Sequence, residues 1–431
     1  MTRFFGQWGR FLMLGAQAQA RWEIDMARTI LADRKRLLIL GLLILPILAG
    51  SIALAAPIGD AMPEFLGGEK AYSPTLFSAG IFGVSVFIGL CAGLITGCIG
   101  AGGGFVIAPA LMSAGIRGIL AVGTDLFHIF AKAIMGTVIH RRLGNVNVAL
   151  AITFLVGAIL GATVGGAINR VVYEVSPVLS DAFITTIYVI ILGGLGFYAL
   201  SDFLRARKKV SVEAPHSGRS EGVEMGGLPR RLQAVKVPPM ITFDQGLVPG
   251  GRRISALFLV LSGALVGFCA SIMGVGGGFL TFPIFVYMLG VSSITTVGTD
   301  IFQIVFTAGY AAISQYAIYG FIFYTLAMGM LLGSLLGIQI GAMVTTVVEG
   351  ITIRGFYATA VLAGFVNRAF ALPGKLAELE VLPLSHSVVD VLNQIGIWAF
   401  FLVIGIFAAW VIGTFFWNLK TLKGESPSHV R

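Results

Sequence analysis

One stretch of the chain concentrates side chains that can move a proton or hold an ion. It starts at Gly123 and reads GTDLFHIFAKAIMGTVIHRR. On a helix, residues three, four and seven apart share a face, so Asp125, His128 and Lys132 form one polar stripe. Ionisable groups at membrane depth are costly, and they usually face a partner or a water-filled cavity. Asp125 and His128 are therefore candidates for binding a coupling cation or carrying a proton, and Lys132 is a candidate for attracting an anion.

The second half of the chain repeats this stripe with less charge. Its text from Gly298 is GTDIFQIVFTAGYAAISQ, which places Asp300 and Gln303 where the first half has Asp125 and His128. The second stripe contains neither lysine nor histidine. Asp300 is a further candidate for ion coupling, and Gln303 is a candidate for substrate binding.

Thr124 and Thr299 precede the two aspartates, and two roles are open for them. They can bind substrate, or they can cap the N-termini of their own helices, where a carboxylate is also favourable. In the second case Asp125 and Asp300 hold the fold and carry no ion. Lys132 likewise either attracts an anionic substrate or neutralises a carboxylate such as Asp125.

A glycine-rich stretch stands before each polar stripe. The first reads GCIGAGGGFVIAP and the second SIMGVGGGFLTFP, so both combine helix-breaking glycines with a proline in an apolar setting. The segment after the first glycines, 104–115, would rise only about 18 Å as a helix, against roughly 30 Å of hydrocarbon. We therefore expect each half to contain a helical hairpin that is broken by glycine within the membrane.

The glycine turns are candidate anion sites. Backbone N–H groups at a helix N-terminus carry partial positive charge, and glycine lets a ligand approach them closely. The candidate substrate-binding residues of these turns are Gly100, Gly102, Gly103, Gly104, Gly274, Gly276, Gly277 and Gly278. The alternative is a tight helix crossing that needs small residues. Nucleotide binding does not fit, because neither stretch contains G-x-x-x-x-G-K-[ST].

Composition indicates the elements that must position these residues. Of 431 residues, 57% are hydrophobic and 11% charged, and the mean hydropathy is +0.92, whereas soluble domains carry roughly 25% charged residues. The chain is therefore predicted to be an all-α polytopic membrane protein. Its net charge of +9 lies mainly in loops, where it indicates orientation and not nucleic-acid binding. Cys91, Cys98 and Cys269 lack metal-ligand spacing, so we expect no metal and no cofactor.

The sequence divides into six parts. In order, these are a basic amphipathic segment (1–36), a first transmembrane helix with a periplasmic connection (37–76), a first transmembrane repeat (77–203), a flexible polar cytoplasmic linker (204–253), a second repeat (254–371), and a last transmembrane helix with a cytoplasmic tail (372–431). Lys and Arg gather near both ends and in the linker, which predicts that both termini lie in the cytoplasm.

The two repeats are expected to have opposite orientations in the membrane. Each has an odd number of crossings and the same motifs, and inverted repeats are typical of secondary transporters with a site near the midplane. Their corresponding glycines are Gly157, Gly161 and Gly165 in the first repeat and Gly333, Gly337 and Gly341 in the second. This small-xxx-small spacing predicts close helix packing.

Three motifs together resemble one known family, the sulfite exporter TauE/SafE family. They are the G-x-G-G-G-x-x-x-x-P hairpin, the Gly-Thr-Asp helix that follows it and the H-R-R-L-G-N-V loop, and the resemblance covers about 77–202 and 254–371. It implies a bacterial plasma-membrane transporter of small anions, often sulfite, sulfonates or related sulfur or carboxylate compounds. The long basic N-terminus and the central linker depart from the family pattern.

We therefore expect a secondary transporter, working as an exporter, of a small anion such as sulfite or an organosulfonate across the bacterial inner membrane. Its expected partners are the anion, the lipid bilayer and a coupling proton or sodium ion, and a homodimer is left open. A passive anion channel is the first alternative, since it would carry flux without an ion gradient. A membrane-embedded enzyme is the second alternative, but G-x-S-x-G is missing, and His128 and His140 lack a third metal ligand.

Overall fold

The computed structural model describes most of the two predicted repeats and the last helix. The described residues are 63, 66, 72, 78–99, 103–142, 146–210, 227–244, 250–345, 347–348 and 350–418. The predicted N-terminal segment and first transmembrane helix lie outside them, and so do Gly100 and Gly102 of the first glycine turn.

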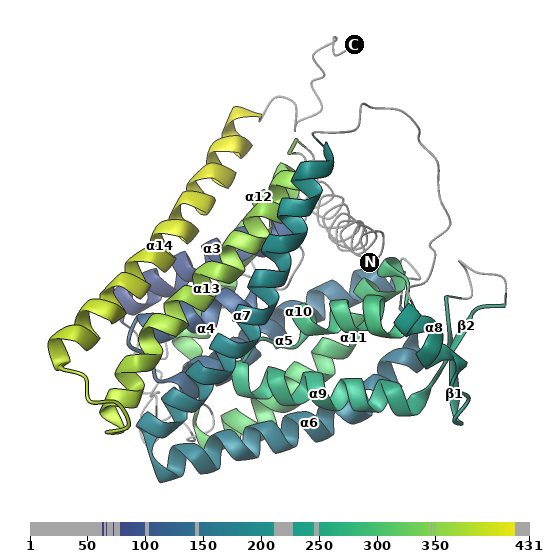
Figure 1. The fold of residues 1–431 in the computed structure, drawn as a ribbon, viewed down its shortest axis with the longest axis horizontal. Coiled ribbons are helices and arrows are strands. Elements are labelled where there is room, and N and C mark those ends of the chain that lie inside the picture. The colour runs from purple at the N-terminus through teal and green to yellow at the C-terminus, as the bar shows by residue number, and fades with distance from the viewer. Residues whose placement is uncertain are drawn as a thin grey trace.

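Long apolar helices make up nearly all of the described chain (Figure 1). The first half contains α3 (Ala79–Ile99), α4 (Gly104–Ser113), α5 (Gly118–Arg142), α6 (Val148–Val175) and α7 (Pro177–Val210). The second contains α9 (Ala256–Met273), α10 (Gly278–Pro283), the helical turns η3 (Ile284–Leu289), η4 (Ala311–Tyr316) and η5 (Ala317–Tyr319), α11 (Ser293–Tyr310), α12 (Tyr324–Val344), α13 (Gly350–Glu378) and α14 (His386–Trp417). Eight of the described helices are long and apolar enough to cross a membrane, which confirms the all-α polytopic class.

The helices of the two halves pair with one another across the molecule. The main contacts join α3 to α12, α6 to α9, α5 to α11 and α7 to α13, and α14 lies beside α13 (Figure 1). By sequence, α3 of the first half corresponds to α9 of the second, and α6 corresponds to α12. Exchanging the two halves therefore converts the α3–α12 pair into the α9–α6 pair. A two-fold relation between the halves would produce this pattern, and the opposite orientation of the halves in a bilayer stays a prediction.

Glycines allow the helices of two of these pairs to pack closely against each other. A Cβ at Gly337 of α12 would lie 2.7 Å from Leu94 N of α3, and a Cβ at Gly165 of α6 would lie 2.7 Å from Phe268 O of α9. The atoms facing these glycines belong to the backbone, so they cannot move aside as a side chain would. The predicted packing role of the small-xxx-small glycines is confirmed.

The central linker is partly ordered, which corrects the prediction of a flexible segment over 204–253. Helix α7 continues to Val210, and the later part of the linker folds into α8 (Gly227–Ala234) and a hairpin of β1 (Met240–Phe243) and β2 (Arg252–Ser255). The strands pair antiparallel, with Met240 opposite Ser255 and Phe243 opposite Arg252.

The two strands are too short to be recognised from the sequence. Each strand has only four residues, which is too short for an alternating pattern to stand out among prolines, glycines and charges. Phe243 and Ile254 are fully buried and pack with Phe154 and Phe285, so tertiary contacts order the hairpin.

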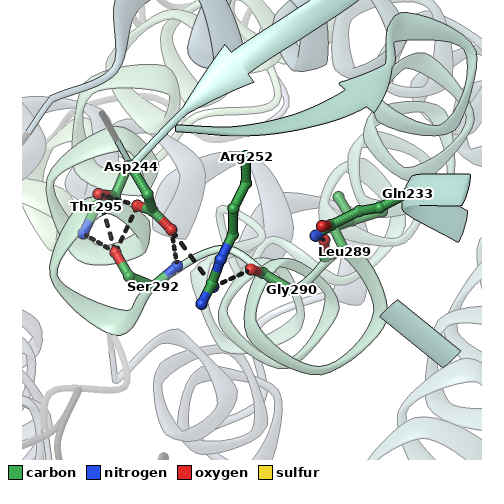
Figure 2. Close-up of polar contacts among 7 residues, drawn as sticks. All are labelled: Gln233, Asp244, Arg252, Leu289, Gly290, Ser292 and Thr295. Atoms are coloured by element: carbon green, nitrogen blue, oxygen red, sulfur yellow. Dashed lines mark hydrogen bonds and ion pairs between the residues drawn. The ribbon is translucent and has the colours of Figure 1, made fainter. Parts of the chain in front are cut away.

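One carboxylate joins this hairpin to α11 (Figure 2). Asp244 accepts hydrogen bonds from Ser292 N (2.9 Å), Ser292 Oγ (2.6 Å) and Thr295 Oγ1 (2.6 Å) at the start of the helix. Arg252 Nη1 lies 3.7 Å from Asp244 Oδ2 and donates to Gly290 O at 2.9 Å. Because Asp244 is only 4% exposed, these contacts are shielded from water and anchor the N-terminus of α11.

Replacing Asp244 with alanine should therefore destabilise the protein. The change removes three hydrogen bonds to a charged group, each worth about 1.5–3 kcal/mol before compensation by water. We expect the free energy of unfolding to fall by roughly 3 kcal/mol, measured by thermal unfolding of purified protein in detergent. The control is Asp390→Ala, at an exposed position on α14, and equal shifts in the two variants would rule out the anchoring role.

Candidate functional site

Glycine breaks both hairpins where the sequence predicts the breaks. Helix α3 ends at Ile99 and α4 begins at Gly104, while α9 ends at Met273 and α10 begins at Gly278. Gly103 and Gly277 are the N-caps of the returning helices, with φ of 63° and 89°. Residues other than glycine rarely adopt this left-handed backbone conformation, which explains why glycine occupies both N-cap positions.

The two hairpins meet at the centre of the protein. A Cβ at Gly104 would lie 3.1 Å from Val275 Cα in the opposite turn. The second turn also packs on α5, because a Cβ at Gly274 would lie 2.8 Å from Val122 Cα and one at Gly276 would lie 2.7 Å from Ile129 Cγ2. These contacts account for glycine by packing alone, so an anion-binding role for the turns stays a prediction.

The first polar stripe brings an aspartate and a histidine together inside the protein. Asp125 and His128 are both fully buried, and Asp125 Oδ1 lies 3.5 Å from His128 Nδ1. His128 Nε2 is 3.0 Å from Ser334 Oγ on α12. Neither carboxylate oxygen of Asp125 has a hydrogen-bond partner among the described residues. The sequence could not indicate Ser334, which comes from the other half.

Lys132 lies one turn beyond His128 and is partly buried. Its charge acts on both Asp125 and His128. The stripe therefore forms a group of three ionisable side chains, as the helical spacing predicts. His140 lies in a part of α5 whose side chains are outside the described residues.

The side chains of the matching stripe on α11 are joined by hydrogen bonds. Asp300 is 8% exposed, and its Oδ1 accepts from Gln303 Nε2 at 2.9 Å. Gln303 Oε1 in turn accepts from Thr307 Oγ1 at 2.7 Å. A Cβ at Gly278 would lie 3.2 Å from Asp300 Oδ2, so this carboxylate faces the second glycine turn. The two halves thus place equivalent aspartates in different surroundings.

Thr124 and Thr299 do not cap their own helices, which corrects that alternative. Helices α5 and α11 begin earlier, at Gly118 and Ser293. Both threonines instead accept a backbone hydrogen bond from the opposite half. Thr124 Oγ1 accepts from Phe323 N at 3.0 Å, and Thr299 Oγ1 accepts from Asn147 N at 3.1 Å. Phe323 and Asn147 are the N-caps of α12 and α6, so each threonine braces the start of a helix in the other half.

Two buried tyrosines that the sequence analysis did not single out support the second hairpin. Tyr188 of α7 donates to Met273 O, and Tyr316 of η4 donates to Ser271 O. Breaking α9 at the glycines frees carbonyl groups in its last turn, and such groups need partners where water is scarce. The tyrosines come from distant elements, so no local pattern indicates them.

Arg368 is a further buried polar residue that sequence reasoning missed. It lies on α13, is 3% exposed and donates to Ser113 Oγ of α4 at 2.9 Å. A sequence signal existed, because an arginine inside an apolar span is unusual. Among the described residues no group of three or more His, Cys, Asp or Glu could hold a metal ion.

Apolar spanning helices, broken hairpins that meet and ionisable groups buried between two related halves are typical of one class, the polytopic helical membrane transporters. The comparison with protein families then names the group. The model of the family described as "Sulfite exporter TauE/SafE" matches residues 85–368. The chain belongs to this family of membrane transporters.

Individual relatives agree with this assignment. The probable membrane transporter protein YjnA of Bacillus subtilis is 26% identical over 265 residues, covering 60% of this chain and 87% of that protein. A probable membrane transporter protein of Xylella fastidiosa is 24% identical over 267 residues, covering 61% of this chain and 84% of that protein. Sulfite exporter TauE/SafE family protein 6 of Arabidopsis thaliana is 32% identical over 132 residues, or 29% of this chain and 30% of that protein. No solved structure matches the chain significantly.

Proposed function

We propose that this protein is a proton-coupled secondary transporter that exports a small anion, such as sulfite, an organosulfonate or a related sulfur compound, across the bacterial plasma membrane. The observation that carries the proposal is the buried group of Asp125, His128 and Ser334 between the two halves. The gathering of Lys and Arg near both ends supports a cytoplasmic position of both termini as part of this proposal.

The hydrogen bonds of this group allow its protons to be counted. Ser334 Oγ is 3.2 Å from Leu331 O, to which it donates its single hydrogen. We infer that it accepts from His128 Nε2 at 3.0 Å, which assigns the hydrogen of the imidazole to that nitrogen. His128 Nδ1 and Asp125 Oδ1 face each other at 3.5 Å without a hydrogen bond between them. We infer that the pair holds one further proton, as a carboxylic acid beside a neutral imidazole or as a carboxylate beside an imidazolium.

Losing that shared proton would leave a buried carboxylate facing a nitrogen lone pair. Such an arrangement is unfavourable unless a donor or cation approaches. The pair is therefore suited to bind one proton in one conformation and to release it in another, when Lys132 or water comes closer.

The position of the group suggests how proton binding couples to movement. Asp125 and His128 belong to α5 of the first half and Ser334 to α12 of the second, so a relative movement of the halves alters the His128–Ser334 contact. Alternating access commonly involves such a movement around a fixed site. A proton that favours one arrangement of the halves shifts the population toward it.

The direct test is anion flux in proteoliposomes. Purified protein is assayed separately for transport of sulfite, sulfoacetate, taurine, thiosulfate and small carboxylates. Each assay is run with a pH gradient, with a sodium gradient and with neither. We expect at least one anion to accumulate only under the pH gradient. Equal flux without any gradient would support the passive channel instead, and chemical conversion of the compound would support the membrane-embedded enzyme. Dependence on sodium alone would overturn the proton coupling.

A further inference from the structure

Arg368 is a buried cation whose immediate partners are neutral. Its Nε donates to Asn367 Oδ1 at 2.7 Å, and its Nη2 contacts Ser113 Oγ at 2.9 Å and Pro109 O at 3.4 Å. Among the described residues no carboxylate lies within ion-pair distance of the guanidinium. Asp181 acts on it only at longer range, and that carboxylate is occupied by Gly118 N (2.8 Å) and Lys375 Nζ (3.6 Å).

A charge in this position is hard to explain by structure alone. Burying an ion without a counter-ion is unfavourable, and a guanidinium keeps its proton at physiological pH. Neutral donors would satisfy the three acceptors equally well. The Nη1 group of the guanidinium has no acceptor among the described residues, so its hydrogens can be donated to a ligand.

The location of Arg368 links it to both glycine hairpins. Helix α13 runs beside α4, since a Cβ at Gly364 would lie 3.4 Å from Phe105 O near the start of α4. Helix α13 also packs on α7, since a Cβ at Gly364 would lie 3.0 Å from Leu192 Cδ1. Tyr188, one turn before Leu192, donates to Met273 O immediately before the second glycine turn. The cation therefore lies between the elements that the two turns position.

We propose that Arg368 is the anion-binding residue of the transport site and that it takes the oxyanion head of a sulfonate, sulfite or carboxylate. The planar guanidinium can donate two parallel hydrogen bonds to two oxygens of such a group, which lysine and a helix terminus cannot do. Ser113 and Asn367, which bond to each other at 3.0 Å, lie at the guanidinium and can rotate toward the ligand. This inference rests on the proposed anion transport and names its binding residue.

The test measures binding and stability separately from transport. Purified wild-type protein, Arg368→Met and Arg368→Lys are titrated calorimetrically with sulfoacetate, sulfite and acetate, and the melting temperature of each protein is measured without ligand. The matched control is Lys375→Met on the same helix, whose ammonium pairs with Asp181 and Glu378. We expect Arg368→Met to weaken oxyanion binding at least about tenfold, Arg368→Lys to weaken it less, and the control to bind like the wild type.

The unliganded melting temperature distinguishes a ligand role from a structural one. Methionine removes the uncompensated buried charge, which favours folding, and it also removes the donations to Asn367, Ser113 and Pro109, which opposes folding. Ser113 and Asn367 keep the hydrogen bonds that they make to each other, so we expect the relief of the buried charge to offset the loss. Arg368→Met should therefore melt no lower than the wild type. A melting temperature lower by several degrees, or oxyanion binding unchanged in Arg368→Met, would each overturn the proposal.

Two further outcomes separate this inference from the proposed function. If the wild type binds none of the three oxyanions, the site is overturned, and flux on the same preparation then reports independently on transport. If binding depends on Arg368 but flux does not depend on the pH gradient, the binding role of Arg368 is supported and the proposed proton coupling is disproved.

Discussion

Replacing Asp125 with asparagine should abolish flux driven by a pH gradient while leaving the protein folded. Asparagine has nearly the same shape, but it cannot take up or release the proton shared with His128. We expect uptake into proteoliposomes to fall at least about tenfold under the gradient, equal to 1.4 kcal/mol or more. Exchange of labelled for unlabelled anion needs no net proton movement, so it should persist.

The structure supplies a matched control at the equivalent position of the second half. Asp300 accepts a hydrogen bond from Gln303 Nε2 (2.9 Å), and asparagine can accept it equally well. Asp300→Asn should therefore keep pH-driven flux within about twofold of the wild type, or about 0.4 kcal/mol. The proton role of Asp125 would be disproved if both variants lost flux equally, or if Asp125→Asn retained pH-driven accumulation.

Adding one methyl group should have opposite effects at two kinds of glycine. At Gly161 and Gly337 a Cβ would lie 2.8 Å from Phe268 N and 2.7 Å from Leu94 N, respectively. Overpacking of this kind typically costs about 1–3 kcal/mol, and more where backbone is the obstacle. We expect Gly161→Ala and Gly337→Ala to lower the melting temperature by several degrees and to reduce the yield of folded protein.

Glycines that face open space provide the comparison. Nothing lies within 4 Å of a Cβ added at Gly194 of α7 or Gly413 of α14. Alanine favours a helix over glycine by roughly 1 kcal/mol, so Gly194→Ala and Gly413→Ala should hold or raise the melting temperature. The packing account would be refuted by the same direction of change at all four positions, measured by thermal unfolding in one detergent.

The difference between Asp125 and Asp300 shows where prediction from sequence ended. The repeated Gly-Thr-Asp motif placed both aspartates on equivalent helix faces, and the structure buries both. Their chemistry differs because one faces His128 and the other is bonded by Gln303. Those neighbours lie one turn away and could be predicted. Ser334, 206 residues along the chain from His128, could not.

The threonines and Arg368 illustrate the same limit. Thr124 precedes an aspartate in a pattern that suggests a local helix cap, but its hydroxyl meets a backbone N–H of the other half. Arg368 stands out in an apolar span, yet only the packing of α13 on α4 gives it Ser113 as a partner. In each case the partner depends on how two distant helices are rotated about their axes.

The sequence alone determined the membrane class, the helical segments, the two glycine breaks and the close packing along the small-xxx-small glycines. These properties depend on apolar length, backbone freedom and helical period, which are set by neighbouring residues. Only the tertiary structure decided that α3 pairs with α12 and α6 with α9, that the linker folds around Asp244, and that Arg368 has no acidic partner among the described residues. Such contacts join residues that are far apart in the chain, and they form only when long-range packing has fixed the register and rotation of every helix.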